Sequence, residues 1–314
     1  VIAELTVDNS NGSDIKTAFF AMNFNEPGWR PLKQHGHRIG IMAPRFVAPY
    51  RKSEKNDGND AEAICEAVGR PSMRFVPVKS AEQQAVLTLH RLRSGLVKDR
   101  TALINQLRGL LSEFGLVMPV GRYSAQAALP QLLEDPSNNL PALARRLLTE
   151  AWARLQAMND QILAYDRDME ALARESEAAR RLMTVPGIGA VTATALIASV
   201  GDPRQFDNGR QFAAWLGLVP RQYTTGGKIR LGRITKRGDV YLRTLLIHGT
   251  RAVLAMLKEK QDRVSCWLRE LVDRRGYKRA AVALAAKNAR VIWALLVKGT
   301  EYERYGLPPL ELAA

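Results

Sequence analysis

TVPGIGAVTATALIASVGD, residues 184–202, is the stretch that decides the fold of the chain's last third. Pro186, Gly187 and Gly189 predict a tight turn, and the small and apolar residues after them predict a helix. Because the first turn of a helix leaves backbone N–H groups free, such a turn is typical of a phosphate-binding site. With another helix ending near Met183, the pattern is that of a helix-hairpin-helix. An ordinary turn between helices, in which glycine serves only as a cap, is the alternative.

The sequence that follows is strongly basic. Residues 201–314 hold 22 Lys and Arg against 10 Asp and Glu, so ion pairs cannot balance the charge and nucleic-acid contact is predicted. Thr224 and Thr225 stand directly before two glycines and a lysine, an order that suits a phosphodiester held beside a nucleophile. A flexible, solvated basic loop is the alternative. The predicted nucleic-acid contacts are Gly187, Gly189, Lys228, Arg230, Arg233, Lys236, Arg237 and Arg243.

Two long helices are predicted before the turn, over about 81–114 and about 141–182. Apolar residues recur in both at steps of three or four, and in the second helix the stripe suits a coiled-coil seam or a long hairpin helix. A helix packed within its own domain and a helix in a dimer contact fit this stripe equally well. Glycine and proline over 118–136 predict a loop between the two helices.

An α/β unit is predicted near the start of the chain. A buried strand is expected at 39–43 and a second short strand at 73–78, with a helix between them that Asn56 or Asp57 caps. Asp57 and Asp60, three residues apart, share a helix face, and two neighbouring carboxylates can hold Mg²⁺. Simple stabilisation of the helix N-terminus by acids is the alternative.

The bulk composition points to a polyanionic partner. The 314 residues carry 46 Lys and Arg against 31 Asp and Glu, a net charge of +15, which favours nucleic acid or an anionic membrane. No uninterrupted apolar run approaches the roughly 18 residues of a membrane span, so no membrane is expected. The two cysteines, Cys65 and Cys266, form no disulfide framework, which suits the cytoplasm. At this length, two domains are the first expectation.

Taken in order, these motifs resemble one family, the DEDD-type transposases of bacterial insertion sequences, which include the Piv-type DNA invertases. The resemblance runs from about His35 to Leu310. It is carried by three segments: HGHRIGIMAPRFVAPYRKSEKNDGNDAEAICEA at 35–67, PGIGAVTATALIASVGDPRQFDNGRQFAAWLGLVPRQ at 186–222 and GGKIRLGRITKRGDVYLRTLL at 226–246.

The resemblance implies an α/β plus all-α architecture in three parts. Residues 1–79 would form a partial RuvC-like domain of the RNase H fold, and 80–182 a long helical coiled-coil spacer with a role in dimerisation. Residues 183–314 would form a helix-rich C-terminal transposase domain with the helix-hairpin-helix. The family places four acids, D, E, D and D, around Mg²⁺, and the last two match Asp57 and Asp60.

The family also implies a nucleophile and partners. Its C-terminal serine attacks DNA and forms a covalent phosphoserine link; that position falls on Thr225, with Thr224 beside it. Members act on DNA as dimers or tetramers, guided by a structured RNA. Residues 1–34 hold only Asp8 and Glu26 as remnants of the first two acids, so we expect an incomplete or divergent N-terminal part and little strand exchange. A decayed transposase that only binds nucleic acid, and a junction nuclease using the acids alone, are the rival hypotheses.

Overall fold

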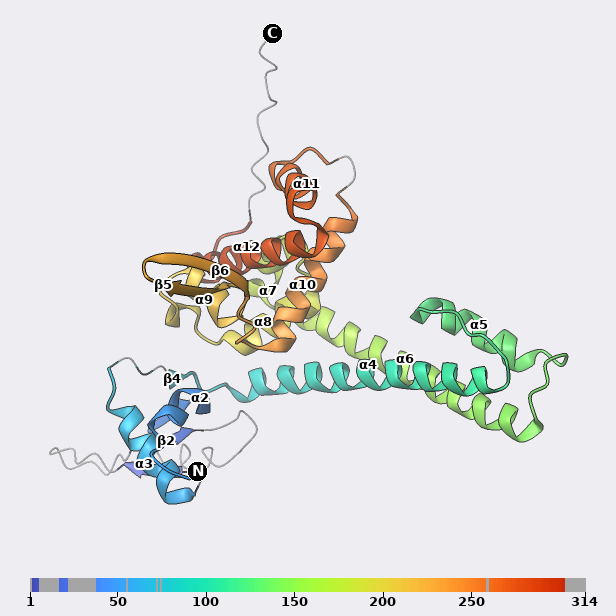
Figure 1. Ribbon diagram of the computed structural model, residues 1–314, viewed down its shortest axis with the longest axis horizontal. Helices are drawn as coiled ribbons and strands as arrows, with labels where there is room; N and C mark the ends of the chain where they lie inside the picture. Colours follow the sequence, from blue (N-terminus) through green and yellow to red (C-terminus); the bar gives the residue numbers. More distant parts are fainter. Residues whose placement is uncertain are drawn as a thin grey trace, which may run out of the picture. The chain divides into compact units, whose positions relative to one another are not determined.

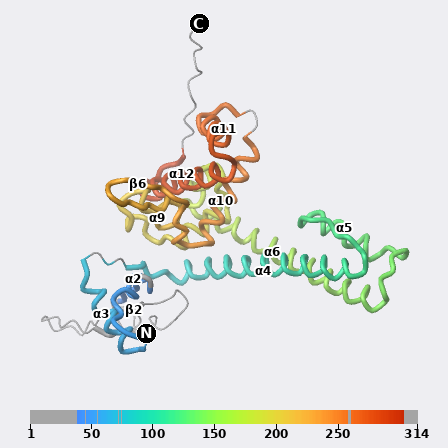
Figure 2. The backbone as a smooth tube through the Cα atoms, in the orientation of Figure 1, coloured from blue at the N-terminus to red at the C-terminus, as the bar shows by residue number. Residues whose placement is uncertain are grey.

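The computed structural model describes most of the chain, which is largely helical (Figure 1). The described residues are 2–5, 17–21, 38–54, 56–71, 73, 75–257 and 260–302. They divide into two compact units, Val1–Ser80 and Ala81–Ala314. Figure 2 traces the backbone through both units by residue number.

A four-stranded sheet forms the centre of the N-terminal unit. Its strands lie in the order β1-β2-β3-β4, with β1 antiparallel to β2, β2 parallel to β3 and β3 antiparallel to β4. The strands are β1 (Ile2–Leu5), β2 (Thr17–Ala21), β3 (Arg38–Met42) and β4 (Phe75–Val76). The strands expected at 39–43 and 73–78 are thus confirmed as β3 and β4.

Three helical segments follow β3. They are α2 (Pro44–Val47), the short 3₁₀ helix η1 (Ala48–Tyr50) and α3 (Asp57–Val68). The Asn56 side chain caps α3 by accepting a hydrogen bond from Asn59 N at 2.7 Å, as the sequence predicts for this position. Ile64 of α3 packs with Met42 of β3 in a small buried core, which holds the second half of α3 beside the end of β3.

The second unit begins with a pair of long helices. These are α4 (Ala81–Glu113) and α6 (Ala142–Glu175), which pack together with α5 (Arg122–Glu134) over a shared apolar core (Figure 1). The loop expected over 118–136 is therefore wrong for most of its length. Helix α5 forms there because Ala125, Leu129 and Leu133 recur at steps of four and are buried against α4 and α6.

The second long helix is also shorter than expected. It was predicted to reach Leu182, but α6 ends at Glu175 and Ser176 adopts an extended conformation. The Ser176 hydroxyl then accepts from Ala179 N and caps a new helix, α7 (Glu177–Met183). A turn at 184–189 leads into α8 (Ala190–Val200), so helix, turn and helix occur where the sequence predicts them.

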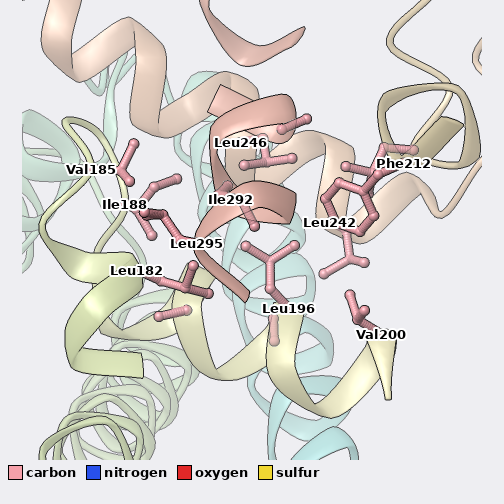
Figure 3. Packing of buried hydrophobic residues seen from close by; sticks show 14 of the residues in the cluster. Leu182, Val185, Ile188, Leu196, Val200, Phe212, Leu242, Leu246, Ile292 and Leu295 are labelled. Atoms are coloured by element: carbon pink, nitrogen blue, oxygen red, sulfur yellow. The ribbon is translucent and has the colours of Figure 1, made fainter. Parts of the chain in front are cut away.

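The rest of the unit folds around α8. It comprises η2 (Pro203–Gln205), α9 (Gly209–Trp215), the strands β5 (Pro220–Thr225) and β6 (Lys228–Ile234), α10 (Val240–Ala255), α11 (Arg263–Arg275) and α12 (Tyr277–Lys298). Figure 3 shows the core that these helices share, in which Leu196 of α8 meets Leu246 of α10 and Ile292 of α12. At their near ends, α4 and α6 also pack against α8, which joins the long helices to this core.

Helix α12 has an unusual composition. Among the described residues it is the one helix long and apolar enough to cross a membrane. It differs from an uninterrupted apolar run because Lys287 and Arg290 lie within it. Leu284 and Ile292 are buried in the two neighbouring cores, so α12 acts as a core helix of the second unit.

Candidate nucleic-acid interface

A two-stranded hairpin, β5–β6, carries three of the six basic residues predicted to bind nucleic acid, namely Lys228, Arg230 and Arg233. The strands pair in a register that sets Thr225 opposite Lys228 and Tyr223 opposite Arg230. They are joined by Gly226 and Gly227, whose φ angles of +57° and +77° suit the two-residue turn favoured in hairpins. Nearly every hairpin residue is exposed. The hairpin is therefore a defined structure, where the alternative from sequence was a flexible basic loop.

The two faces of the hairpin differ in chemistry. Because side chains alternate along a strand, Tyr223, Thr225, Lys228 and Arg230 share one face. Thr224 lies on the other face with exposed Ile229 and Leu231. The Thr224 hydroxyl accepts a hydrogen bond from Gln222 Nε2 at 3.0 Å. Within the described part of the chain, the Thr225 side chain makes no hydrogen bond. The register thus pairs the hydroxyl of Thr225, and not that of Thr224, with the cationic face.

The cations of the hairpin are not neutralised by nearby acids. Among the described residues, no ion pair involves Lys228, Arg230 or Arg233. Lys236 follows the hairpin with a positive φ of +56°, and its backbone N donates to Gly217 O at 3.1 Å, which fixes the exit of β6. The exposed part of this surface is available to a polyanion.

Arg243 differs from the other predicted contacts. It is 7% exposed, and its Nη1 donates to Leu216 O at 3.1 Å and to Gly238 O at 3.3 Å. A phosphate cannot reach a guanidinium that is buried and bound to the carbonyls of the fold. We therefore leave Arg243 out of the interface: it holds the base of the hairpin to the start of α10. Arg237, also predicted, is engaged in an interaction within the protein.

The turn at 184–189 is partly buried against α10. Gly187 has a φ of +87°, and a Cβ there would lie 2.8 Å from Gly249 O. Asn288 of α12 donates from Nδ2 to Pro186 O at 2.9 Å, which anchors the turn from the other side. Gly189, the residue that starts α8, is exposed and has no neighbour within 4 Å of an added Cβ. Gly187 thus has a packing reason to be glycine, whereas the space in front of Gly189 is open.

The predicted metal ligands lie at the start of α3. Asp57 is exposed, and Asp60 Oδ1 accepts from Arg51 Nη1 at 3.5 Å. Within the described part of the chain, no three or more His, Cys, Asp and Glu side chains gather in a metal-binding group. Asp8 and Glu26, named from sequence as remnants of the first two acids, lie outside the described residues.

Comparison with known proteins gives this arrangement a context. The model of the IS116/IS110/IS902 transposase family matches residues 179–265, and the model of the DEDD transposases of IS110 matches residues 16–115. The chain is 54% identical over 274 residues to a probable family 20 transposase of Pseudomonas aeruginosa, which covers 87% of this chain and 81% of that protein. The chain belongs to this transposase family.

Other members are similarly close to this IS110-type transposase. It is 48% identical over 274 residues to the transposase for insertion sequence element IS1111A of Coxiella burnetii, covering 87% of this chain and 75% of the relative. It is 40% identical over 276 residues to the transposase for IS1328 of Yersinia enterocolitica, covering 88% and 81%. The resemblance inferred from sequence is confirmed: the chain is a transposase of the kind encoded by insertion sequences.

Two features of this transposase were missed from its sequence. One is the β-hairpin, although a Gly-Gly pair between residues of high strand propensity is a usual hairpin signal. The other is the buried position of Arg243, which no local pattern indicates. An arginine that binds the carbonyls of its own fold looks, in sequence, like one that binds phosphate.

Proposed function

We propose that this transposase catalyses DNA recombination, the excision and insertion of an insertion sequence by metal-assisted phosphoryl transfer. The observation that carries the proposal is the register of the hairpin, which sets Thr225 directly opposite Lys228 with Arg230 on the same face. A phosphodiester laid on this face would meet a hydroxyl and two cations together. Cations held in place stabilise the charge that develops on the phosphate during attack.

In the proposed covalent step, Thr225 Oγ1 attacks the phosphorus of a DNA phosphodiester. A new bond forms between oxygen and phosphorus, and the bond from phosphorus to the leaving sugar oxygen breaks. The proton of the hydroxyl passes through solvent to the leaving sugar oxygen. Lys228 and Arg230 hold the phosphate, and reversal of the step on another DNA end joins the strands.

Asp57 and Asp60 are the residues we propose to hold Mg²⁺. Their carboxylates lie one turn apart at an exposed helix start and provide the oxygen donors that this ion prefers. Arg51 beside Asp60 would have to release it, and the 3.5 Å separation of their atoms indicates a weak bond that permits this. When bound, the ion would supply charge stabilisation to a phosphodiester.

The proposed partners are DNA and a structured guide RNA. Besides the hairpin, the turn at 184–189 would bind one phosphate as a helix-hairpin-helix, because α8 presents its N-terminus at exposed Gly189. We also propose that residues 1–79 form a RuvC-like domain, which the parallel pair β2–β3 and helix α3 support. The excess of positive charge in the last third suits both nucleic acids, and we place the reaction in the cytoplasm.

The long helices α4 and α6 are the proposed contact between protomers in a dimer or tetramer. The side chains of Leu92 in α4 and Leu163 in α6 are more than half exposed. The apolar stripe predicted along α6 is buried within its own unit at Leu148, Leu155, Ile162 and Met169, so the proposed contact would use these exposed leucines instead. Their exposure supports the role of residues 80–182 as an oligomerising spacer.

A covalent-adduct assay tests the proposed reaction. The full chain is incubated with Mg²⁺, RNA from the flank of its element and labelled DNA spanning the element end, and adducts are separated under denaturing conditions. Thr225→Ala should abolish the adduct and retain DNA binding, and Thr225→Ser should increase it because a primary hydroxyl is less crowded. Thr224→Ala is the matched control and should keep the adduct, since that side chain lies on the other face of the hairpin.

Three outcomes would contradict parts of this assignment. An adduct that persists in Thr225→Ala but is lost in Thr224→Ala would move the nucleophile to the neighbouring residue. DNA binding with no adduct in the original chain and in Thr225→Ser alike would favour the rival function, a nucleic-acid-binding protein without catalysis. An adduct that survives Asp57→Ala with Asp60→Ala would remove these acids from the reaction.

A further inference from the structure

A groove lies at the far end of α10 from the hairpin, beside the turn at 184–189, whose Pro186 and Gly187 line it. It encloses about 900 Å³ between the end of α10, the start of α11 and the second half of α12. A second hollow of about 540 Å³ continues it and shares Lys287, Val291 and Ala294 with it. The hairpin leads into the start of α10 and the groove lies at its end, so the 16 residues of this helix separate them by about 24 Å.

Cations outnumber acids in the lining of the groove, with Lys260, Arg263, Lys287 and Lys298 against Asp262 and Glu301. Arg263, Lys287, Arg290 and Lys298 line it, and no ion pair within the described ranges involves any of them. Asp262, also in the lining, is occupied as the cap of α11: its Oδ1 accepts from Ser265 N and its Oδ2 from Ser265 Oγ. The groove therefore carries a net positive charge that attracts anions.

Lys287 is held at the junction of the two hollows by an aromatic ring. Its Nζ lies 4.9 Å from the centroid of the Trp267 ring, a cation–π contact that positions the ammonium but brings no negative charge. Burial, together with the charges of Arg263 and Arg290, lowers the pKa of Lys287 below its usual value. A phosphate bound among these three cations would relieve their mutual repulsion.

The floor between the cations is apolar. Met256, Val264, Val291 and Ala294 contribute to it, and Met256 is largely exposed. In a duplex the bases are stacked inside, whereas a single strand can turn its bases into an apolar recess and leave its phosphates on the basic rim. A positively charged groove with apolar or aromatic surface for the bases is typical of single-strand binding.

We infer that this groove binds a single-stranded segment of nucleic acid, with phosphates on Arg263, Lys287 and Arg290 and bases against the apolar floor. The inference rests on the proposed function, since it assumes that the chain handles nucleic acid. It adds a second site, separate from the hairpin, and a preference for unpaired strands. Such a site would hold a strand displaced or unpaired during recombination.

Fluorescence anisotropy on the full chain tests the inference. The probes are a labelled single-stranded oligonucleotide of mixed sequence and the duplex of the same sequence. Arg263→Gln with Lys287→Gln should weaken single-strand binding about tenfold and lower the slope of log affinity against log salt by about 1.4, or 0.7 per lost contact. Duplex binding should change less than about twofold, because the hairpin carries it.

Arg274→Gln with Arg275→Gln is the matched control. These exposed residues end the same helix α11, and their loss removes the same charge outside the groove. If this control weakened single-strand binding as much as the groove variant, the effect would be one of net charge and the inference would fail. Equal losses for single strand and duplex in the groove variant would overturn it too.

A second readout guards against an effect on folding. A single strand carrying a photoreactive thymidine analogue should cross-link to peptides within residues 256–298 in the original chain, and the groove variant should lose those cross-links while unfolding at the same temperature. Cross-links confined to residues 220–237 would overturn the inference. If the original chain bound neither the single strand nor the duplex, the proposed function itself would fail. Normal duplex binding without single-strand binding would overturn only the inference about the groove.

Discussion

Two glycine turns in the second unit, at Gly226–Gly227 and at Gly187–Gly189, have similar sequences and opposite surroundings. A Cβ added at Gly226 or Gly227 would meet nothing within 4 Å. A Cβ at Gly187 would lie 2.8 Å from Gly249 O, and one at Gly249 would lie 1.8 Å from Gly187 O. The hairpin turn needs glycine for its backbone conformation alone, whereas the other turn needs it for conformation and for packing.

The difference shows how this unit separates stability from contact with a partner. The packed turn joins α7 and α8 to α10 and belongs to the core, so changes there act on folding. The hairpin projects from a base fixed by the buried Arg243, so changes at its tip act on binding. A glycine-rich turn in the sequence therefore does not reveal by itself whether it contacts a ligand or its own protein.

The largest expected effect separates the two turns by stability. Gly249→Ala forces a Cβ into Gly187 O and should lower the free energy of unfolding by about 3 kcal/mol, the upper range for overpacking. Gly227→Ala, strained only by its positive φ, should cost about 1 kcal/mol. Urea denaturation followed by circular dichroism measures both. Similar losses at the two positions would remove the contrast.

The stability of the second unit should depend on pH because of His90, which contacts α8 and α10. Its Nδ1 lies 2.9 Å from Tyr241 Oη and its Nε2 lies 3.0 Å from Thr194 Oγ1 of α8. Burial, with a smaller contribution from Arg93, lowers its pKa to about 4. Because the unfolded state takes up a proton first, stability is full above about pH 6.5 and falls as the pH drops towards 4.

The loss of stability between pH 7 and pH 4.5 should be at most about 3 kcal/mol, at about 1.4 kcal/mol for each pH unit below 6.5. Denaturation curves at pH 7 and pH 4.5 measure it, and His90→Gln should reduce the difference. The acid sensitivity would have another source if the variant kept the full difference.

An intermediate effect is expected at the hairpin. Lys228→Gln with Arg230→Gln should leave the free energy of unfolding within about 0.5 kcal/mol, since both side chains are exposed. Affinity for duplex DNA should fall about tenfold, and the salt slope should fall by about 2, one for each phosphate contact. Titrations at several salt concentrations provide the measurement. Unchanged affinity and slope would show that the hairpin faces something other than DNA.

The smallest effect is expected at the open end of the other turn. Gly189→Val places a side chain in empty space, so the protein should fold normally. It would keep a phosphate from the start of α8 and cost about 0.3–1 kcal/mol, a roughly two- to fivefold loss of affinity that is the same for all DNA sequences. Binding to two unrelated duplexes measures it. Normal affinity for both would assign the turn to structure alone.

Much of the helical framework could be predicted because it depends on local signals. Asn56 caps α3 and Gly189 starts α8 where the sequence indicates, and the periodic apolar residues of α4 and α6 mark long helices. The errors arose where one local signal outweighed another. Glycine and proline between Gly121 and Pro136 predict a loop, but the leucines between them recur with helical spacing and form α5. The apolar stripe predicts a helix running through Ser176, but this serine ends one helix and caps the next.

The rest depends on contacts between distant residues. Gly187 and Gly249 are 62 positions apart, and no pattern around either indicates that their backbones touch. Arg243 reaches back to Leu216 O, so its burial follows from the fold and not from its neighbours in sequence. The opposite directions of Thr224 and Thr225 follow from the strand register, which required the hairpin to be recognised first.

The central position of α12 has a consequence for how this protein is made. Residues 277–298 are translated after the helices that they cover, and Ala289 and Leu295 of α12 complete the core that α8 and α10 begin. Until those residues emerge from the ribosome, the apolar faces of α8 and α10 stay open to water, so this unit cannot finish folding during synthesis of its earlier parts. We expect nascent chains stalled before residue 277 to be held by chaperones, and released when α12 closes the core.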